Sequence, residues 1–246
     1  MKVFTLNLGN SRAAAGWFAR GKIQRAARSA SISPVILETV ANGEMPDCIC
    51  VGSVVPKTNA TWRRLLRQTF PRVPVLWMDH RLDLGIPLDL KRPDQTGHDR
   101  LADAVAAADL CGTPCIACDF GTATTFNLVL PRRGFVGGVI APGYGMWFES
   151  LASAAQLPEL KPGGIKVKTG RNTEEAIRLS GRWGYRGMIT EILRHLSKSC
   201  GRREPELCAT GGYARKVLHH TGLKMKIIRD LTLEGLGRIA LRNFEE

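Results

Sequence analysis

The sequence predicts an α/β protein whose strands form mixed or parallel sheets. Short apolar runs alternate with longer segments in which apolar side chains recur about every 3.6 residues, as expected for strands joined by helices. Hydrophobic residues make up 44% and charged residues 23% of the 246 residues, the balance of a globular protein with a sizeable core. Intrinsic disorder is therefore not expected.

Eight elements are predicted in chain order from these two patterns. They are strands at Val3–Leu8 and Asp47–Val51, helices at Thr61–Phe70 and His98–Leu110, a strand at Cys115–Asp119, a helix at Thr173–Ser197, a strand at Leu207–Thr210 and a helix at Leu233–Phe244. Each strand is a short apolar run, and each helix is a longer segment with helical apolar spacing. The helix that begins at Thr173 also has acids at Glu174 and Glu175, which suit the positive end of a helix dipole.

An excess of basic residues limits the choice of partners. Lys and Arg outnumber Asp and Glu by 35 to 22, for a net charge of +13, and this balance attracts phosphorylated ligands or nucleic acid. The densest clusters are Arg63, Arg64 and Arg67, and Lys224, Lys226 and Arg229. Neither contains the interleaved aromatic residues of a single-strand binder, so we expect solvated faces and no nucleic-acid partner.

The apolar runs and the cysteines indicate the compartment. No run approaches the roughly 20 apolar residues of a membrane-spanning helix, and the first apolar run is broken at Asn7, too early for a signal-peptide core. The seven cysteines are an odd number, typical of free thiols in a reducing compartment. Zinc binding by Cys111, Cys115 and Cys118 lacks an evident fourth ligand. We predict a cytoplasmic protein without a membrane partner.

A weak internal repeat marks two strand ends. Asn7 ends an apolar strand and is followed by Gly9, and 112 residues later Asp119 ends another and is followed by Gly121. Small hydroxyl or amide residues come next in both places. Glycine allows a sharp turn and close approach to a ligand, backbone N–H groups and hydroxyls can donate to phosphate oxygens, and an acid can hold a cation. Two ordinary turns are the alternative interpretation, because the same residue types favour turns.

These loops stand in a series of motifs that resembles the type III pantothenate kinases, members of the sugar kinase, Hsp70 and actin superfamily. The matching segments are residues 7–11, 52–56, 97–100, 119–125, 137–143, 172–173, 184–187 and 209–212. Neither loop has a Walker A or Rossmann pattern, so a different nucleotide fold is expected.

The resemblance implies a fold, a reaction and partners. The fold would be two ribonuclease H-like, or actin-like ATPase, halves flanking an ATP cleft. Residues 1–114 would carry the first phosphate loop, and residues 115–246 the second loop and the adenosine motif. The reaction would transfer the ATP γ-phosphoryl group to pantothenate, giving 4'-phosphopantothenate, the first step of coenzyme A synthesis. Magnesium, potassium or ammonium, and a homodimer that completes the pantothenate pocket are implied as well.

The resemblance also implies site residues. ATP contacts would come from Asn7, Gly9, Asn10, Ser11, Arg12, Thr122, Gly211 and Gly212. Pantothenate contacts would come from Gly97, His98, Asp99, Arg100 and Thr173. Asp99 would be the general base and Asp119 the ligand of a monovalent cation. A helix N-terminal acid at Asp99 and a surface charge at Arg100 are the competing interpretations.

Several positions depart from the family pattern. Asn7 stands where the family has an aspartate, and an amide can coordinate a cation but lacks the carboxylate charge. Asn127 also stands where relatives tend to carry an aspartate, His98 replaces an alanine, and Leu90 replaces an aromatic residue. His98 is either a phosphate contact or acid, or a neighbour without a chemical role.

These departures leave three hypotheses. The first is a pantothenate kinase. The second, motivated by Asn7, is a kinase-like protein that binds a nucleotide or metabolite with little or no turnover. The third is a kinase of another small hydroxylated substrate, which fits the changes at Leu90 and His98.

Overall fold

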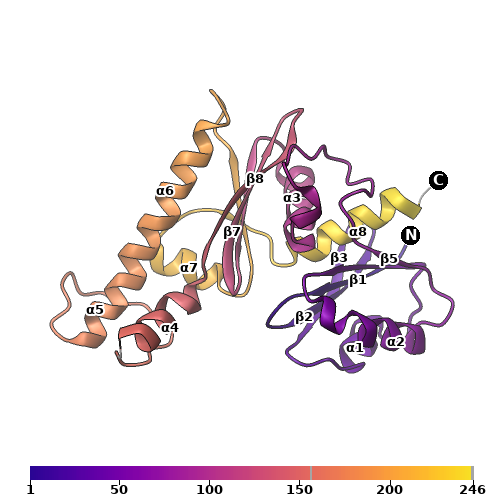
Figure 1. Ribbon diagram of the computed structural model, residues 1–246, viewed down its shortest axis with the longest axis horizontal. Coiled ribbons are helices and arrows are strands. Elements are labelled where there is room, and N and C mark those ends of the chain that lie inside the picture. Colours follow the sequence, from indigo (N-terminus) through magenta and orange to yellow (C-terminus); the bar gives the residue numbers. More distant parts are fainter. Residues whose placement is uncertain (156, 245–246) are drawn as a thin grey trace. The chain divides into compact units, whose positions relative to one another are not determined.

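The chain forms two five-stranded sheets with matching strand order (Figure 1). The computed structural model describes residues 1–155 and 157–244. The first sheet has the order β3-β2-β1-β4-β5, and the second has the order β10-β9-β6-β7-β8, which is the same arrangement listed from the other edge. In each sheet the first strand pairs antiparallel with the next strand and parallel with a later one. The predicted α/β fold is confirmed, and the internal repeat corresponds to these two sheets.

Packing divides the chain into two compact units. The first contains residues 1–110, 131–136 and 230–246, and the second contains residues 111–130 and 137–229. The last helix, α8 (Leu231–Phe244), therefore packs with the first unit although it ends the chain. The division into domains 1–114 and 115–246 stays a prediction.

The first unit holds the N-terminal sheet and four of the described α-helices. Its strands are β1 (Val3–Leu8), β2 (Ala13–Ala19), β3 (Lys22–Ser29), β4 (Cys48–Ser53) and β5 (Val75–Trp77). Its helices are α1 (Val35–Ala41), α2 (Asn59–Thr69), α3 (His98–Cys111, whose last residue counts with the second unit) and α8. Figure 1 shows α1 and α2 on one side of this sheet and α8 on the other. Phe4, Leu6, Trp62 and Leu66 are among the side chains buried between sheet and helices.

The second unit contains the other sheet and its helices. Its strands are β6 (Cys115–Phe120), β7 (Ala123–Leu130), most of β8 (Gly134–Pro142), β9 (Glu206–Thr210) and β10 (Lys226–Ile227). Its helices are α4 (Tyr144–Ala155), α5 (Thr173–Leu179), α6 (Tyr185–Lys198) and α7 (Ala214–Thr221). Among the residues described, no helix has both the length and the apolar character needed to cross a membrane.

All eight predicted elements are present, and one of them has an interruption. The helix expected over Thr173–Ser197 consists of α5 and α6 joined by a π-helical turn, Ser180–Gly184. Two glycines of this turn pack closely on α4: a methyl group on Gly181 would lie 2.3 Å from Phe148 Cζ, and one on Gly184 would lie 2.9 Å from Trp147 Cζ2. The rings of Phe148 and Trp147 thus lie directly against the helix where it widens into the π-helical turn.

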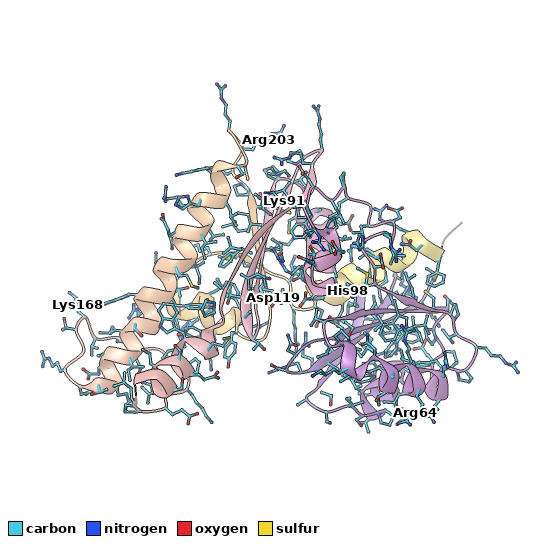
Figure 2. The ribbon with its side chains drawn as sticks, viewed as in Figure 1. Arg64, Lys91, His98, Asp119, Lys168 and Arg203 are labelled. Carbon is cyan, nitrogen blue, oxygen red and sulfur yellow. The ribbon has the colours of Figure 1, made fainter. Side chains whose placement is uncertain are left out.

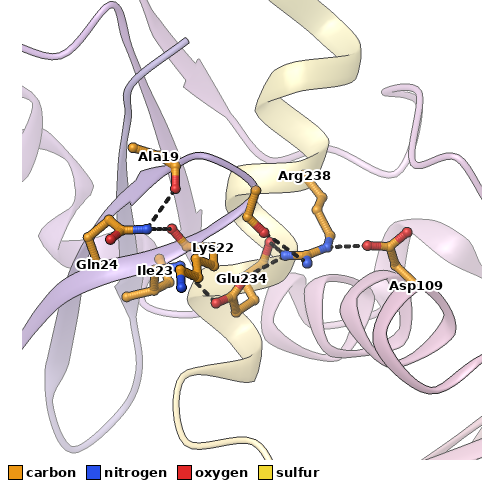
Figure 3. Close-up of polar contacts among 8 residues, drawn as sticks. Ala19, Lys22, Ile23, Gln24, Asp109, Glu234 and Arg238 are labelled. Carbon is orange, nitrogen blue, oxygen red and sulfur yellow. Dashed lines mark hydrogen bonds and ion pairs between the residues drawn. The ribbon is translucent and has the colours of Figure 1, made fainter.

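Polar contacts fix α8 to the first unit (Figure 3). Glu234 Oε1 accepts a hydrogen bond from the backbone N–H of Ile23 at 2.8 Å. Arg238 donates to Glu234, to Asp109 of α3 at 2.6 Å and to the carbonyl of Gly21. One helix at the end of the chain thereby joins the β2–β3 hairpin to α3.

The contact between α8 and α3 generates a prediction about stability. A methyl group on Gly235 would lie 2.0 Å from the carbonyl oxygen of Ala102, so the helices can approach this closely only with glycine there. We expect Gly235→Ala to lower the free energy of unfolding by about 1–3 kcal/mol, although alanine is the better helix former. Urea denaturation measures this change.

Gly187→Ala is the matched control, because Gly187 is an exposed helical glycine with no atom within 4 Å of an added methyl group. It should raise the free energy of unfolding by up to about 1 kcal/mol. A stabilising Gly235→Ala would contradict the close packing of α3 and α8.

Candidate functional site

The first phosphate loop lies at the carboxyl end of β1. Asn7 pairs in parallel register with Gly52 of β4, and Leu8 accepts a hydrogen bond from Val54 at 3.0 Å. The N–H of Gly9 then donates to the carbonyl of Arg12 at 3.1 Å, which closes a tight turn into β2. Asn10, Ser11 and Arg12 are exposed on this turn. The predicted loop residues therefore lie together at one strand end, where α/β proteins commonly bind ligands.

Asn7 carries a polar atom that the fold leaves unsatisfied. Its Oδ1 is buried and has no hydrogen-bond partner among the described residues. It lies beside Gly52, where an added methyl group would be 3.7 Å from Asn7 Oδ1 and 3.6 Å from His98 Cβ. A buried acceptor without a partner is costly, so the position suits a ligand that supplies a donor or a cation.

His98, labelled in Figure 2, is the first residue of α3, and a hydrogen bond holds it to β4. Its Nδ1 accepts a hydrogen bond from the backbone N–H of Ser53 at 3.3 Å. Burial lowers the pKa of His98, and the nearby carboxylates of Asp79 and Asp99 offset this only in part. The imidazole is therefore neutral at pH 7, with its proton on Nε2.

Asp99 follows in the first turn of α3, where the helix dipole favours a negative charge. Its Oδ1 accepts from the N–H of Arg100 at 2.8 Å, and a methyl group on Gly97 would lie 2.6 Å from the same oxygen. Glycine at position 97 thus leaves room beside the carboxylate. The Arg100 guanidinium lies over the ring of Phe135 at 5.6 Å, and burial lowers its pKa.

The second loop has the equivalent position in the other sheet. Asp119 is the next-to-last residue of β6, as Asn7 is of β1, and it pairs in parallel register with Thr210 of β9 (Figure 2). Gly211 follows β9 with φ +92°, and a methyl group there would lie 2.2 Å from Asp119 Oδ1. The two predicted motifs around Asp119 and Gly211 are therefore in contact.

The remaining residues of the second unit lie on neighbouring turns. The N–H of Gly121 donates to Ala123 at 3.1 Å, and a methyl group on Gly143 would lie 1.9 Å from the carbonyl of Thr122. Gly212 is exposed on the turn that leads to α7. Two backbone segments therefore lie close together at Gly143, where there is no room for a side chain.

Thr173 belongs to another part of this unit, the N-terminus of α5. Asn172 caps the helix by accepting from the N–H of Glu175 at 2.9 Å, and Glu175 accepts in return from the N–H of Arg171. A cavity of about 590 Å³ opens beside the cap. Its lining includes Leu151, Leu157, Arg171, Thr173 and Ile177. Polar cap residues thus face an otherwise apolar hollow, as in many small-molecule sites.

Sequence analysis missed Asp79 and His80, which influence the charge of His98. Arg81 donates two hydrogen bonds to Asp79 and holds the pKa of that carboxyl well below its usual range. Both residues closely follow β5, the third parallel strand of the first sheet. The rule that ligands bind at the carboxyl ends of parallel strands would have found them, had the short strand Val75–Trp77 been recognised.

The donor set fits a cation held jointly with a ligand. Among residues 1–155 and 157–244, no three His, Cys, Asp or Glu side chains are grouped for one metal ion. Asp119 provides a carboxylate, an oxygen ligand of the kind that hard cations prefer. A single carboxylate fits a cation that takes its other ligands from a bound molecule or from water.

The paired sheets and their strand-end loops define the fold of the sugar kinases and actin-like ATPases. A Campylobacter jejuni structure assigned to the Baf family of transcriptional activators has TM-score 0.62 at 14% identity, with 98% of each chain covered. A ROK family protein from Streptococcus pneumoniae has TM-score 0.50 at 12% identity, again with 98% of each chain covered.

The family follows from sequence similarity. Residues 3–195 match the family model of type III pantothenate kinase. The type III pantothenate kinase of Gluconobacter oxydans is 38% identical over 78% of this chain and 71% of its own length. That of Streptomyces griseus is 30% identical over 98% of both chains. The chain belongs to the type III pantothenate kinase family.

The cysteines of the second unit generate a prediction about reactivity. A hydrogen bond with Cys208 lowers the pKa of Cys111, and Lys226 acts in the same direction, whereas burial raises the pKa of Cys200. Both Cys111 and Cys200 are half-buried. Because the thiolate is the reactive form, we expect iodoacetamide to modify Cys111 faster than Cys200 at pH 7.5. Peptide mass spectrometry over time measures both rates.

Cys111→Ser should remove the fast phase. The alkylation rate of Cys111 should also reach its plateau at a lower pH than that of Cys200. Faster modification of Cys200 would contradict the assigned direction of the Cys111 pKa.

Proposed function

We propose that this protein transfers the γ-phosphoryl group of ATP to the primary hydroxyl of pantothenate, forming 4'-phosphopantothenate. The family match over residues 3–195 carries the proposal, and it favours the first of the three hypotheses drawn from the sequence. In this phosphoryl transfer the protein would mainly position the two reactants and neutralise charge on the phosphates.

Asp99 is the proposed general base. Its carboxylate is half-buried, stands in the first turn of α3 and has Gly97 beside it, features that support approach of a hydroxyl group. The carboxylate would accept the hydroxyl proton as the oxygen attacks phosphorus. Gly97, His98, Arg100 and Thr173 are the further proposed contacts of pantothenate.

The two loops are the proposed ATP contacts. Asn7, Gly9 and the exposed turn that follows them would approach the phosphates in the first unit, and Thr122, Gly211 and Gly212 would contact ATP in the second. Asp119 would hold potassium or ammonium. A bound Mg²⁺ would neutralise charge on the phosphates during transfer.

The proposed setting is a homodimer in the cytoplasm. Exposed apolar side chains at Ile140, Met146 and Trp183 supply surface that a second copy could cover. Seven free cysteines support a reducing compartment.

The decisive experiment measures phosphopantothenate formation by the purified chain with saturating ATP, magnesium and potassium. We expect turnover by the natural protein and a decrease in kcat of about 10²- to 10⁴-fold in Asp99→Asn, because the amide cannot accept the proton. Asp94→Asn is the control, since Asp94 is an exposed acid close in sequence that pairs only with Arg92 among the described residues. It should leave kcat unchanged.

Asn7→Asp belongs in the same assay. The added carboxylate should lower the magnesium concentration needed for half-maximal rate, because charge strengthens the attraction for a hard cation. A natural chain that stays inactive while Asn7→Asp is active would overturn the proposed activity and favour a binding role.

A further inference from the structure

Two thiols of the second unit lie in contact and have no part in the proposed reaction. Cys111 is the last residue of α3 and counts with the second unit, and Cys208 lies in the middle of β9. A hydrogen bond joins the two side chains. Cys111 is half-buried, whereas Cys208 is fully buried. A reagent in water therefore reaches this pair through Cys111.

The register of the second sheet explains why these two cysteines meet. The backbone N–H of Glu206, where β9 begins, donates to the carbonyl of Pro114 at 3.0 Å, which brings β9 beside the short segment that follows α3. Cys208 is the register partner of Lys226 in β10. Paired residues of a parallel ladder have their side chains on the same face of the sheet, and the charge of Lys226 also acts on Cys111. Cys111, Cys208 and Lys226 therefore form one cluster.

The two sulfur atoms of this cluster have different protonation. The thiol of Cys208 donates to the sulfur of Cys111, which lowers the pKa of Cys111 and raises the pKa of Cys208. The positive charge of Lys226 favours the thiolate of Cys111 further. Because the thiolate is the nucleophile, Cys111 is the sulfur that attacks an electrophile, and Cys208 keeps its proton beside it.

The other cysteines of the second unit are less reactive. Burial raises the pKa of Cys115, Cys118 and Cys200, so these side chains remain thiols at neutral pH. Cys200 is half-buried like Cys111, but its thiol donates to the carbonyl of Leu196 in its own helical turn. Cys111 therefore combines access from water, a stabilised thiolate and contact with a second thiol.

We propose that hydrogen peroxide converts Cys111 and Cys208 into a reversible disulfide, with Cys111 as the attacking thiolate and Cys208 as the resolving thiol. Cys111 Sγ first attacks a peroxide oxygen: the S–O bond forms, the O–O bond breaks, and the leaving hydroxide takes a proton from solvent to become water. Cys208 Sγ then attacks Cys111 Sγ: the S–S bond forms, the S–O bond breaks, and the Cys208 proton leaves with the hydroxyl group as water. The two sulfur atoms give two electrons to the peroxide, and a dithiol reductant restores both thiols.

The test treats the full natural chain with hydrogen peroxide at pH 7.5, blocks the remaining thiols with iodoacetamide and maps the unreduced peptides by mass spectrometry over time. We expect the first crosslink to join the Cys111 and Cys208 peptides, with a mass lower by two hydrogen atoms, and dithiothreitol to remove it. Cys200→Ser is the matched control, because Cys200 is also half-buried. It should leave the rate of this crosslink unchanged.

Cys208→Ser isolates the first step. A serine hydroxyl cannot resolve a sulfenic acid, so the oxidised Cys111 should be trapped by dimedone and otherwise proceed to the sulfinic acid, with no crosslink. A natural chain in which Cys111 joins Cys115 first, becomes a sulfinic acid without a crosslink or stays reduced would overturn the inference. The crosslink map of the natural chain decides this even if Cys208→Ser fails to fold. Neither cysteine is a proposed contact of ATP or pantothenate, so the result is independent of the proposed reaction.

Discussion

Parallel pairing of one early strand with one later strand is the constraint on which both halves of the molecule depend. β1 pairs with β4, and β6 pairs with β9, so that segments distant in sequence end at the same sheet edge. In the first unit this brings Asn7 next to Gly52 and allows Ser53 to hold His98. In the second it brings Asp119 next to Gly211. Ligands commonly bind at such strand ends in α/β proteins, and at this edge of the first sheet the Asn7 Oδ1 has no hydrogen-bond partner among the described residues.

Glycine makes the close approach possible at these edges. Gly211 adopts a left-handed φ of +92° within contact distance of the Asp119 carboxylate, where any side chain would collide with both the carboxylate and the Phe120 backbone. In the first unit Gly52 is the register partner of Asn7, as Thr210 is of Asp119 in the second, and the space that Gly52 leaves is bordered by Asn7 and His98. At both strand ends a glycine without a side chain therefore allows close approach to a polar group, which is Asp119 in the second unit and Asn7 in the first.

The sequence indicated the strands with continuous apolar runs and the helices with regular spacing. β1 and β6 were recognised because both are almost wholly buried. β3 was missed because it alternates between exposed and half-buried residues and is rich in polar side chains, and β5 because it has only three residues. The position of α8 could not be predicted either, since its contacts with β1, β2 and α3 are set by tertiary packing.

The candidate site was predictable as motifs but not as contacts. Asp119 and the glycines are visible as residue types at strand ends and Asp99 as one at a helix start, whereas the link between Ser53 and His98 joins positions 45 residues apart. The unsatisfied oxygen of Asn7 likewise appears only once the surrounding backbone is known. Interatomic distance, and not residue type, distinguishes a polar neighbour from a ligand contact.

Asn7 and Asp119 hold equivalent positions in the two sheets but differ by one charge, and this difference matters for His98. A carboxylate beside Gly52 would add to Asp79 and Asp99 and raise the pKa of His98. The neutral amide leaves burial as the dominant influence, so the ring keeps one proton and one fixed donor. Asn7 therefore adds no charge to those that Asp79 and Asp99 already place near His98. The two equivalent strand ends thus differ in charge, with an amide at Asn7 and a carboxylate at Asp119.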